Sequence, residues 1–197
     1  MVNGFFALLS RMKYISRWGL MRSSIPENIQ EHSHETAVYA HALGLIRREV
    51  FGRDCDAERL AVLALYHDAS ETLTGDLPTP IKYYDPAIRD AYKTVEHIAE
   101  EKLVTMLPEE LRGAYRELLA PAEGDAELWR LVKAADKLSA LNKCIEERKT
   151  GNREFLSAEA ATRRALEETG LAEVAWFMEH CLAACELNLD ELGTMEP

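Results

Sequence analysis

The sequence has little that would tie it to a membrane or to a nucleic-acid polymer. Its most apolar early run, Phe5 to Leu9, is too short to cross a bilayer, and basic residues follow it without the cleavage pattern of a secretory signal. The 23 Lys and Arg are outnumbered by 34 Asp and Glu, and a net charge of -11 has the wrong sign for binding a nucleic-acid backbone or an anionic membrane. A phosphate-bearing partner must therefore be bound by a local site.

Cysteine is also scarce and shows no paired pattern. The four residues, Cys55, Cys144, Cys181 and Cys185, form no CxxC motif and no dense framework, so we interpret them as reduced thiols of a cytoplasmic protein. Cys181 and Cys185 stand four residues apart near His180, but a thiolate zinc site normally has tighter paired spacing. Buried cysteines in an Ala- and Leu-rich helix usually act as small apolar residues.

Strand-like alternation is hard to find, whereas apolar residues recur every three or four residues almost throughout. The sequence therefore predicts an all-α fold, a compact helical bundle in which residues 1–197 form a single domain. The acidic last ten or so residues are expected to be frayed. The expected helices cover residues 3–14, 31–50, 56–68, 85–106, 108–120, 125–148, 154–168 and 171–186.

A polar pair, His67-Asp68, closes the third expected helix. A loop with one glycine and two prolines, Thr72 to Pro80, follows it directly. A His next to an Asp is a weak signal alone, but a polar pair at the end of an apolar helix is costly unless it has partners. If the helix continues for one more turn, Glu71 projects to the same side as the pair. Two metal ligands and a spare carboxylate would then meet at one helix end.

Helix geometry separates the histidines of the second helix. At about 100° per residue, His34 and His41 lie within about 20° of each other, whereas His32 lies about 160° from His34. The three cannot serve one site. We interpret His34 and His41 as a shared polar or partly buried face and keep His32 as a candidate ligand.

Asp136 is the last candidate, because it is an acid inside an Ala- and Leu-rich helix. A surface pairing with Lys133 or Lys137 explains its spacing equally well. Two imidazoles and two carboxylates would suit an octahedral divalent ion such as Co, Mn, Ni or Fe better than a closed structural zinc site. The open positions could bind a phosphate oxygen and a water whose pKa is lowered.

The ordered set His32, His67-Asp68 and Asp136 resembles that of the HD-domain phosphohydrolase superfamily. Longer stretches are similar to those of bacterial HD-domain 5′-deoxynucleotidases, and this resemblance covers nearly the whole chain. The LTGDLPTP loop and the Arg17-Trp18 pair are far more specific than the His-Asp pair. The stretches are Arg11-Met12-Lys13, Arg17 to Arg22, Glu31-His32-Ser33, Leu65 to Glu71, Leu73 to Pro80, Pro108 to Arg112, and Gly151-Asn152.

The resemblance implies an activity and a cofactor. Members of that family remove phosphate from deoxyribonucleoside 5′-monophosphates and discriminate against ribonucleotides, as cytoplasmic homodimers that need a divalent metal. We expect one ion per subunit, with Co²⁺ favoured and Mn²⁺, Ni²⁺, Fe²⁺, Cu²⁺, Mg²⁺ or Zn²⁺ as alternatives. One ion is expected because only His97 lies between the His-Asp pair and Asp136, and it fits a solvated helix face better than a second metal site.

The resemblance also implies roles for individual residues. The catalytic residues would be Glu71, which assists the attacking water, and Arg17, which orients the phosphate. Trp18 would press on the sugar where a ribose 2′-hydroxyl would sit, although a Trp beside Gly19 and Leu20 is also typical of a core. The metal ligands would be His32, His67, Asp68 and Asp136. The substrate contacts would be Arg17, Trp18, His32, Asp68, Asp76, Leu77, Pro78, Thr79 and Asp136.

Two alternatives remain. An HD site could act on a deoxynucleoside triphosphate or a cyclic phosphodiester, but the loop from Gly75 to Pro80 has no Lys or Arg for further phosphates. The chain could also be a non-catalytic module that senses a nucleotide. Glu71 argues against a sensor, because simple binding needs no group that transfers a proton.

Overall fold

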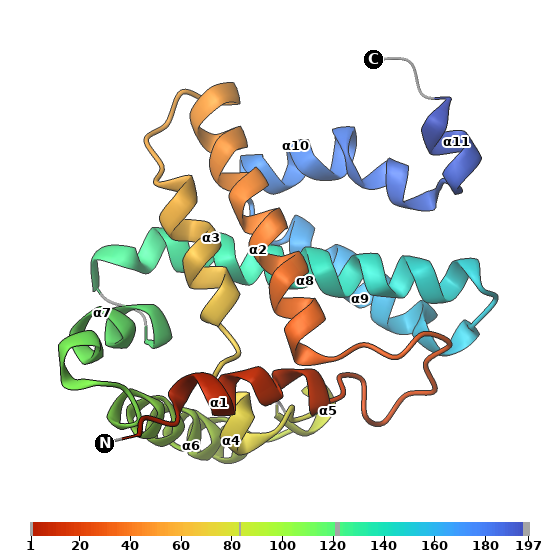
Figure 1. Ribbon diagram of the computed structural model, residues 1–197. Coiled ribbons are helices and arrows are strands. Elements are labelled where there is room, and N and C mark those ends of the chain that lie inside the picture. The colour runs from red at the N-terminus through yellow and green to blue at the C-terminus, as the bar shows by residue number, and fades with distance from the viewer. Residues whose placement is uncertain (1, 83, 121–122, 195–197) are drawn as a thin grey trace.

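The computed structural model describes residues 2–82, 84–120 and 123–194, and within these ranges its regular structure is helical (Figure 1). One isolated β-bridge, between Ser16 and Asn28, is the exception among them. The all-α prediction is confirmed. The α-helices are α1 (Phe5–Leu9), α2 (Ile29–Leu45), α3 (Ala57–Tyr66), α4 (Glu71–Thr74), α5 (Thr79–Lys82), α6 (Pro86–Thr105), α7 (Glu109–Leu119), α8 (Ala126–Lys149), α9 (Leu156–Glu167), α10 (Ala172–His180) and α11 (Leu189–Gly193).

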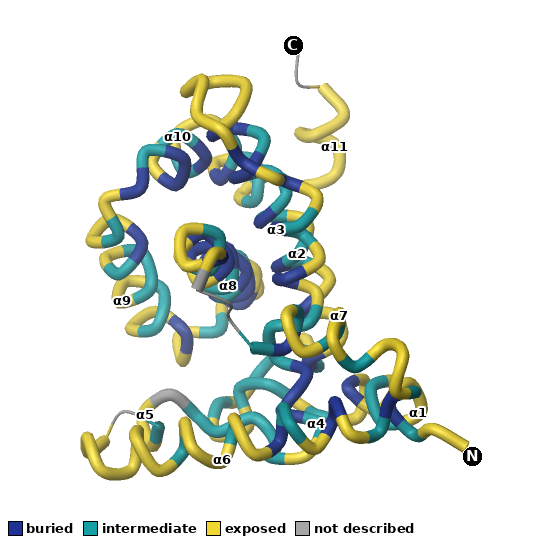
Figure 2. The backbone as a smooth tube through the Cα atoms, turned by 90° about the vertical axis from the view of Figure 1, so that its left-hand side faces the viewer, coloured by how far each residue is buried: buried dark blue, intermediate teal, exposed yellow. Residues whose placement is uncertain are grey.

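Helix α8 is the centre of the larger layer, and α2, α3, α9 and α10 surround it (Figure 2). It carries fully buried apolar side chains along most of its length, including Leu131, Leu138, Leu141 and Ile145. Each such side chain contributes about 1.5–3 kcal/mol when it leaves water. The central position of α8 therefore follows from its apolar surface.

Helices α1, α4, α5 and α6 form a second layer beside this bundle (Figures 1 and 2). Its core is a separate cluster in which Phe5, Leu103 and Leu107 are fully buried. Ala69 belongs to the same cluster and is also fully buried. Because Ala69 directly follows the His-Asp pair, that pair lies where the chain passes from one layer to the other.

Helices α2 and α3 approach each other unusually closely. A Cβ atom on Gly44 would lie 2.8 Å from the Cβ of Ala57, so only glycine permits this contact. The start of α2 is fixed by a capping box, in which the Asn28 side chain accepts from the Glu31 N–H and Glu31 accepts from the Asn28 N–H. This cap places His32 in the first turn of α2, where its ring contacts Ser139 and Asp136 of α8.

Several helix boundaries differ from the predicted ones. The segment expected to be helical over residues 3–14 is α1 followed by a 3₁₀ turn, Ser10–Tyr14, and α2 ends in a π turn, Ile46–Val50. The helix expected over residues 171–186 is α10, which ends at His180 before the 3₁₀ turn Leu182–Glu186. The helix expected over residues 154–168 starts as a 3₁₀ turn, Arg153–Phe155, and continues as α9.

A short helix, α11, lies within the C-terminal segment whose fraying stays a prediction. Asn188 caps α11, accepting from the Glu191 N–H at 3.0 Å. Residues 195–197 lie outside the described residues. Nowhere in the described residues does a helix reach the length and apolar character needed to cross a bilayer.

Candidate active site

The His-Asp pair lies in a turn, not in a helix. Helix α3 ends at Tyr66, two residues before the predicted end at Asp68, so the condition that it continue for one more turn to Glu71 is not met. The chain leaves the helix axis because Ala69 enters the core of the second layer, and α4 begins at Glu71. The turn still keeps Glu71 beside the pair, since its N–H donates to the Asp68 carbonyl at 3.0 Å.

Three predicted metal ligands converge. His32, His67 and Asp68 each offer one ligand atom, and the three atoms all lie within 4.8 Å of one another. The Asp68 Oδ2 lies 3.1 Å from the His67 Nε2 and 3.6 Å from the His32 Nε2. Neighbouring ligands of one ion at about 2.1 Å are separated by roughly 3.0–3.4 Å. The observed spacing therefore fits a shared ion.

The His67 ring is oriented for this role by its backbone. Its Nδ1 donates to the Ala64 carbonyl at 2.7 Å, so the Nε2 is the nitrogen that can bind an ion. That Nε2 is buried and has no hydrogen-bond partner, although the Asp68 Oδ2 is only 3.1 Å away. The close approach of the two atoms fits two ligands of one ion.

Asp136 approaches the group from α8. Its Oδ1 lies 3.1 Å from the His32 Nε2, but Asp136 is outside the three-residue group. The surface pairing considered above is not formed, because Lys137 donates to the Lys133 carbonyl instead. Burial alone would raise the pKa of Asp136, but the imidazoles of His32 and His67 lower it well below its usual range.

Arg17 and Trp18 reach the site on a loop that is closed at its base. The Arg17 N–H donates to the Glu27 carbonyl at 3.0 Å, next to the bridge between Ser16 and Asn28. One oxygen of the Glu27 side chain, Oε2, accepts from the Arg17 Nε at 3.2 Å and from the Trp18 Nε1 at 2.6 Å. Glu27 therefore holds both side chains.

Trp18 has a strained backbone. Its φ of 60° lies in the left-handed region, where it is the only non-glycine among the described residues. Its ring packs edge-on against the fully buried Phe155, with centroids 5.2 Å apart, so one edge of the Trp18 ring contacts the hydrophobic core. The neighbouring Arg17 guanidinium lies 3.6 Å from the Asp68 Oδ2. Burial lowers the pKa of Arg17, but the negative charges of Asp136, Glu27 and Asp68 raise it, and the net result is a pKa above its ordinary value.

Glu71 is buried, and its Oε2 has no hydrogen-bond partner. Burial, together with the nearby charges of Asp68 and Asp76, raises the pKa of Glu71 to about 10. Burial also raises the pKa of Asp76, while Arg17 opposes that shift. An unpartnered carboxyl group beside the ligand atoms is costly for stability and is therefore a candidate for chemistry.

The remaining predicted substrate residues follow α4. Leu77 and Pro78 are half-buried in the connection between α4 and α5. Thr79 is the first residue of α5, and its side chain lies outside the described part of the structure. Helix α4 ends at Gly75, whose φ of 74° favours glycine.

Other histidines face away from this chemistry. The side chain of His97 is 67% exposed and contacts Glu100 on its own helix, as expected for a solvated face. His34 is exposed and His41 is half-buried. The four cysteines are unpaired.

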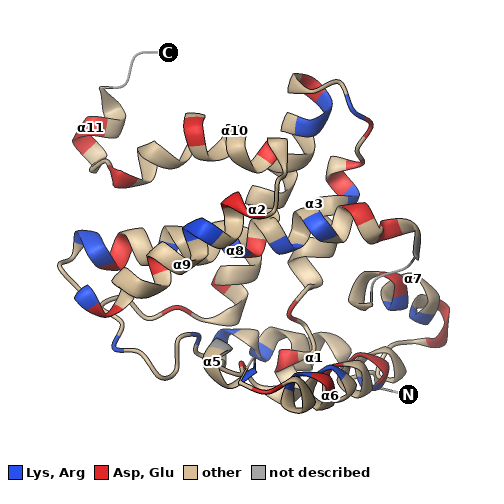
Figure 3. Ribbon diagram, turned by 180° about the vertical axis from the view of Figure 1, so that it is seen from behind, with Lys and Arg blue, Asp and Glu red and all other residues tan. Residues whose placement is uncertain are grey.

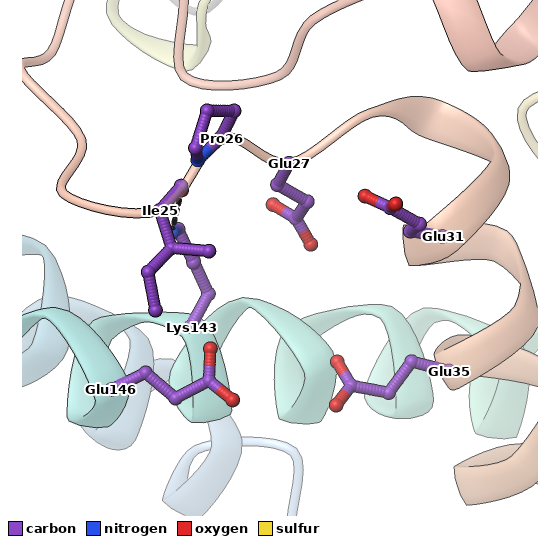
Figure 4. A pocket seen from close by; sticks show the side chains of 7 residues that line it. All are labelled: Ile25, Pro26, Glu27, Glu31, Glu35, Lys143 and Glu146. Carbon is purple, nitrogen blue, oxygen red and sulfur yellow. Dashed lines mark hydrogen bonds between the residues drawn. The ribbon is translucent and has the colours of Figure 1, made fainter.

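A pocket lies beside the ligand group, and its lining is acidic (Figure 4). Four glutamates from α2, α8 and the preceding loop face it, with one lysine. Four glutamates against one lysine make this pocket electrostatically unfavourable for a phosphate group. Its lining residues are Ile25, Pro26, Glu27, Glu31, Glu35, Lys143 and Glu146.

Elsewhere on the surface, basic and acidic residues are interspersed over both layers (Figure 3). Arg17 is thus set apart from the surface basic residues by its burial, since its side chain is only 12% exposed. Sequence reasoning missed Glu27, because neither a motif nor a spacing links it to Arg17-Trp18. The signal that could have found it is a lone acid directly before the cap of a helix.

Comparison with known proteins identifies the family of the chain. Residues 4–185 match the family described as 5′-deoxynucleotidase YfbR-like. A 5′-deoxynucleotidase YfbR from Shigella boydii serotype 18 is 48% identical over 193 residues, which cover 98% of this chain and 97% of that protein.

Two solved structures share the fold. An HD-domain phosphohydrolase from Listeria innocua superposes with a TM-score of 0.80 at 23% identity, over 96% of this chain and 92% of that one. A cyanophage S-2L HD phosphohydrolase, bound to dA and one catalytic Zn²⁺ ion, superposes with a TM-score of 0.65 at 19% identity, over 90% and 95% of the chains. With the match over residues 4–185, the chain belongs to the YfbR-like 5′-deoxynucleotidase family.

Proposed function

We propose that this chain is a metal-dependent 5′-deoxynucleotidase, which hydrolyses deoxyribonucleoside 5′-monophosphates to a deoxynucleoside and inorganic phosphate. One observation carries the proposal. The ligand atoms of His32, His67 and Asp68 converge beside the unpartnered carboxyl group of Glu71, with the Arg17 guanidinium 3.6 Å from Asp68. Family membership over nearly the whole chain points to the same reaction.

His32, His67, Asp68 and Asp136 would hold one divalent ion per subunit. The donor set fits, because the Nε2 of His67 is buried without a partner and Asp136 lies 3.1 Å from the same nitrogen of His32 that faces Asp68. A bound divalent ion polarises a phosphate oxygen and lowers the pKa of a coordinated water. The mixed nitrogen and oxygen set suits a divalent ion such as Co²⁺, Mn²⁺, Ni²⁺ or Fe²⁺. Co²⁺ is favoured by the resemblance to HD-domain 5′-deoxynucleotidases, and Cu²⁺, Mg²⁺ and Zn²⁺ are further candidates.

Two side chains of the protein have separate roles in the proposed reaction. Arg17 binds and orients the phosphate, since a guanidinium presents forked donors to two phosphate oxygens. Glu71 would accept a proton from the attacking water once a bound cation favours its carboxylate form. Asp68 contributes to the raised pKa of Glu71, and this contribution falls when the charge of Asp68 is neutralised by a cation.

The sugar and base would be bound by the loops on either side. Trp18 presses on C2′ and leaves no room for a ribose hydroxyl, and its strained backbone and its bond to Glu27 hold it in place. Asp76 accepts from the 3′-hydroxyl, and Leu77, Pro78 and Thr79 line the rest of the pocket. The site would thereby select deoxynucleotides by shape.

The proposal is tested by phosphate release from dAMP, AMP and dATP, with Co²⁺ and after chelation. We expect release from dAMP that requires the metal, with little release from AMP or dATP. His67→Asn should abolish it, whereas the matched control His97→Asn, at an exposed histidine, should not. No metal-dependent release from any deoxynucleoside monophosphate would contradict the enzyme, and equal rates with dAMP and AMP would contradict the role of Trp18.

We further propose that the enzyme works in the cytoplasm as a homodimer. Four unpaired thiols are typical of a reducing compartment. Ile88, Val95 and Ile98 are exposed along α6 and offer apolar surface for the dimer contact. Sedimentation of the purified chain tests this, and a monomer at all concentrations would contradict it.

A further inference from the structure

The second nitrogen of His32 has its own partner on α8. His32 is fully buried, and its Nδ1 lies 3.0 Å from the hydroxyl of Ser139, which is also fully buried. The Nδ1 also lies 3.9 Å from the Glu27 Oε1, a second acceptor. The side of the ring away from the candidate metal therefore meets only groups that can accept a proton.

The direction of this hydrogen bond follows from the next one. Ser139 donates its only hydroxyl hydrogen to the Glu35 Oε2 at 2.5 Å, because a carboxylate oxygen can only accept. Towards His32 the hydroxyl must therefore accept, so the Nδ1 of His32 carries a hydrogen. The Nε2, which faces Asp68, Asp136 and the Thr36 hydroxyl, is then the nitrogen that can bind an ion.

Glu35 is itself fixed by two further donors. Its Oε1 accepts from the Asn142 Nδ2 at 2.8 Å and from the Tyr39 hydroxyl at 3.2 Å. Figure 4 shows the Glu35 side chain projecting from α2 across to α8. The chain of bonds from His32 through Ser139 to Glu35 thus ties the first turns of α2 to the middle of α8.

The two histidines of the site are oriented by different means. His67 donates to a backbone carbonyl, that of Ala64, which no substitution can remove. His32 donates to a side chain, which a substitution can remove without touching the backbone. This difference makes the orientation of His32 separately testable.

From these contacts we propose that Ser139 and Glu35 are positioning residues that set the tautomer and ring orientation of His32, and thereby the affinity of the site for its divalent ion. The inference rests on the proposed metal site. Outer partners of a metal-bound histidine typically change metal affinity by about 10–100-fold.

The test measures Co²⁺ affinity by competition with a chromophoric chelator, together with the absorption spectrum of the bound Co²⁺. Ser139→Ala should weaken binding about 10–100-fold and shift the spectrum, and saturating Co²⁺ should restore most of the activity. Glu35→Gln should weaken binding less, about three- to tenfold, because an amide oxygen still accepts from Ser139. If the Ser139→Ala variant does not fold, Glu35→Gln serves as the test variant in its place.

The matched control is Glu146→Gln, which removes one negative charge from the acidic pocket that Glu35 also lines but makes no bond to Ser139. Its Co²⁺ affinity should stay within about twofold of the unchanged chain. Affinities within twofold for Ser139→Ala and Glu35→Gln would overturn this inference alone. An unchanged chain that binds no Co²⁺ would overturn both this inference and the proposed metal site. A loss of affinity in Glu146→Gln equal to that in Glu35→Gln would show a charge effect and overturn the positioning role.

Discussion

Two buried polar clusters lie along α8, and they differ in how their polar atoms are used. We call them the ligand cluster (His32, His67, Asp68 and Glu71) and the Glu147 cluster (Glu147, Lys143, Asn152 and the N–H groups of Ser24 and Ile25). In the ligand cluster, the His67 Nε2 and the Glu71 Oε2 have no hydrogen-bond partner. In the Glu147 cluster, both carboxylate oxygens accept several bonds, among them one from Lys143 at 2.5 Å.

The difference separates what stabilises the fold from what is kept for chemistry. A buried carboxylate with all its partners stabilises the native state, whereas an unpartnered one lowers its stability. Glu147 holds the backbone of Ser24 and Ile25, near the end of the loop that carries Arg17 and Trp18. Substitutions in the Glu147 cluster should therefore change stability, and those in the ligand cluster should change catalysis.

The largest effect is expected for Asp68→Asn. The variant removes an anionic ligand of the proposed ion. Metal-dependent phosphate release from dAMP should fall by more than about 10⁴-fold, because the ion and its water lower the activation free energy by several kcal/mol. The free energy of unfolding of the chelated protein should change by less than about 1 kcal/mol. A stability loss as large as that of a core substitution would contradict the proposal that the ligand cluster serves catalysis and the Glu147 cluster serves stability.

Glu71→Gln should have the next largest effect. It keeps the size of the side chain and removes proton transfer, so kcat should fall about 10²–10⁴-fold while Co²⁺ affinity stays within a few-fold. Denaturant unfolding should show unchanged or raised stability, since the buried Oε2 has no partner to lose. Near-normal kcat would remove Glu71 from the mechanism.

Glu147→Gln should lower stability and leave the chemistry intact. Burial would raise the pKa of Glu147, but Lys143, Asn152 and the N–H groups of Ser24 and Ile25 lower it to about 2. Since the folded pKa lies below the unfolded one, this stabilisation of about 3 kcal/mol is present above about pH 4.5 and is lost as the pH falls towards 2.

Urea unfolding at pH 7.5 and pH 3 measures this difference between the variant and the unchanged chain, which should shrink at the lower pH. Glu154→Gln is the control, because Glu154 pairs with a 93% exposed Arg22 and should cost less than about 0.5 kcal/mol. A difference that does not depend on pH would mean that the charge of Glu147 is not what stabilises the loop.

Trp18→Ala should have the smallest effect, on selectivity. The ratio of kcat/KM for dAMP over AMP should fall about tenfold, since exclusion by one ring is worth about 1–3 kcal/mol. Trp176→Ala is the control, because Trp176 stacks on His180 of α10. An unchanged ratio in Trp18→Ala would mean that another group reads the 2′ position.

The fold was predictable where the signal is local. Periodic apolar residues predicted the helices, and the position of His67-Asp68 before a Gly/Pro loop singled it out. Helix ends that depend on packing were not predictable, as at Tyr66, where the core of the second layer draws Ala69 away from the helix axis. Partners distant in sequence were also missed, since Ser139 lies 107 residues from His32.

The contrast between the clusters is tested most directly by a crystal of the protein grown with Co²⁺ and measured at the cobalt absorption edge. We predict one anomalous peak per subunit, bound by the Nε2 atoms of His32 and His67 and by carboxylate oxygens of Asp68 and Asp136. A peak in the acidic pocket beside Glu31 instead, or no peak at His67, would contradict the account.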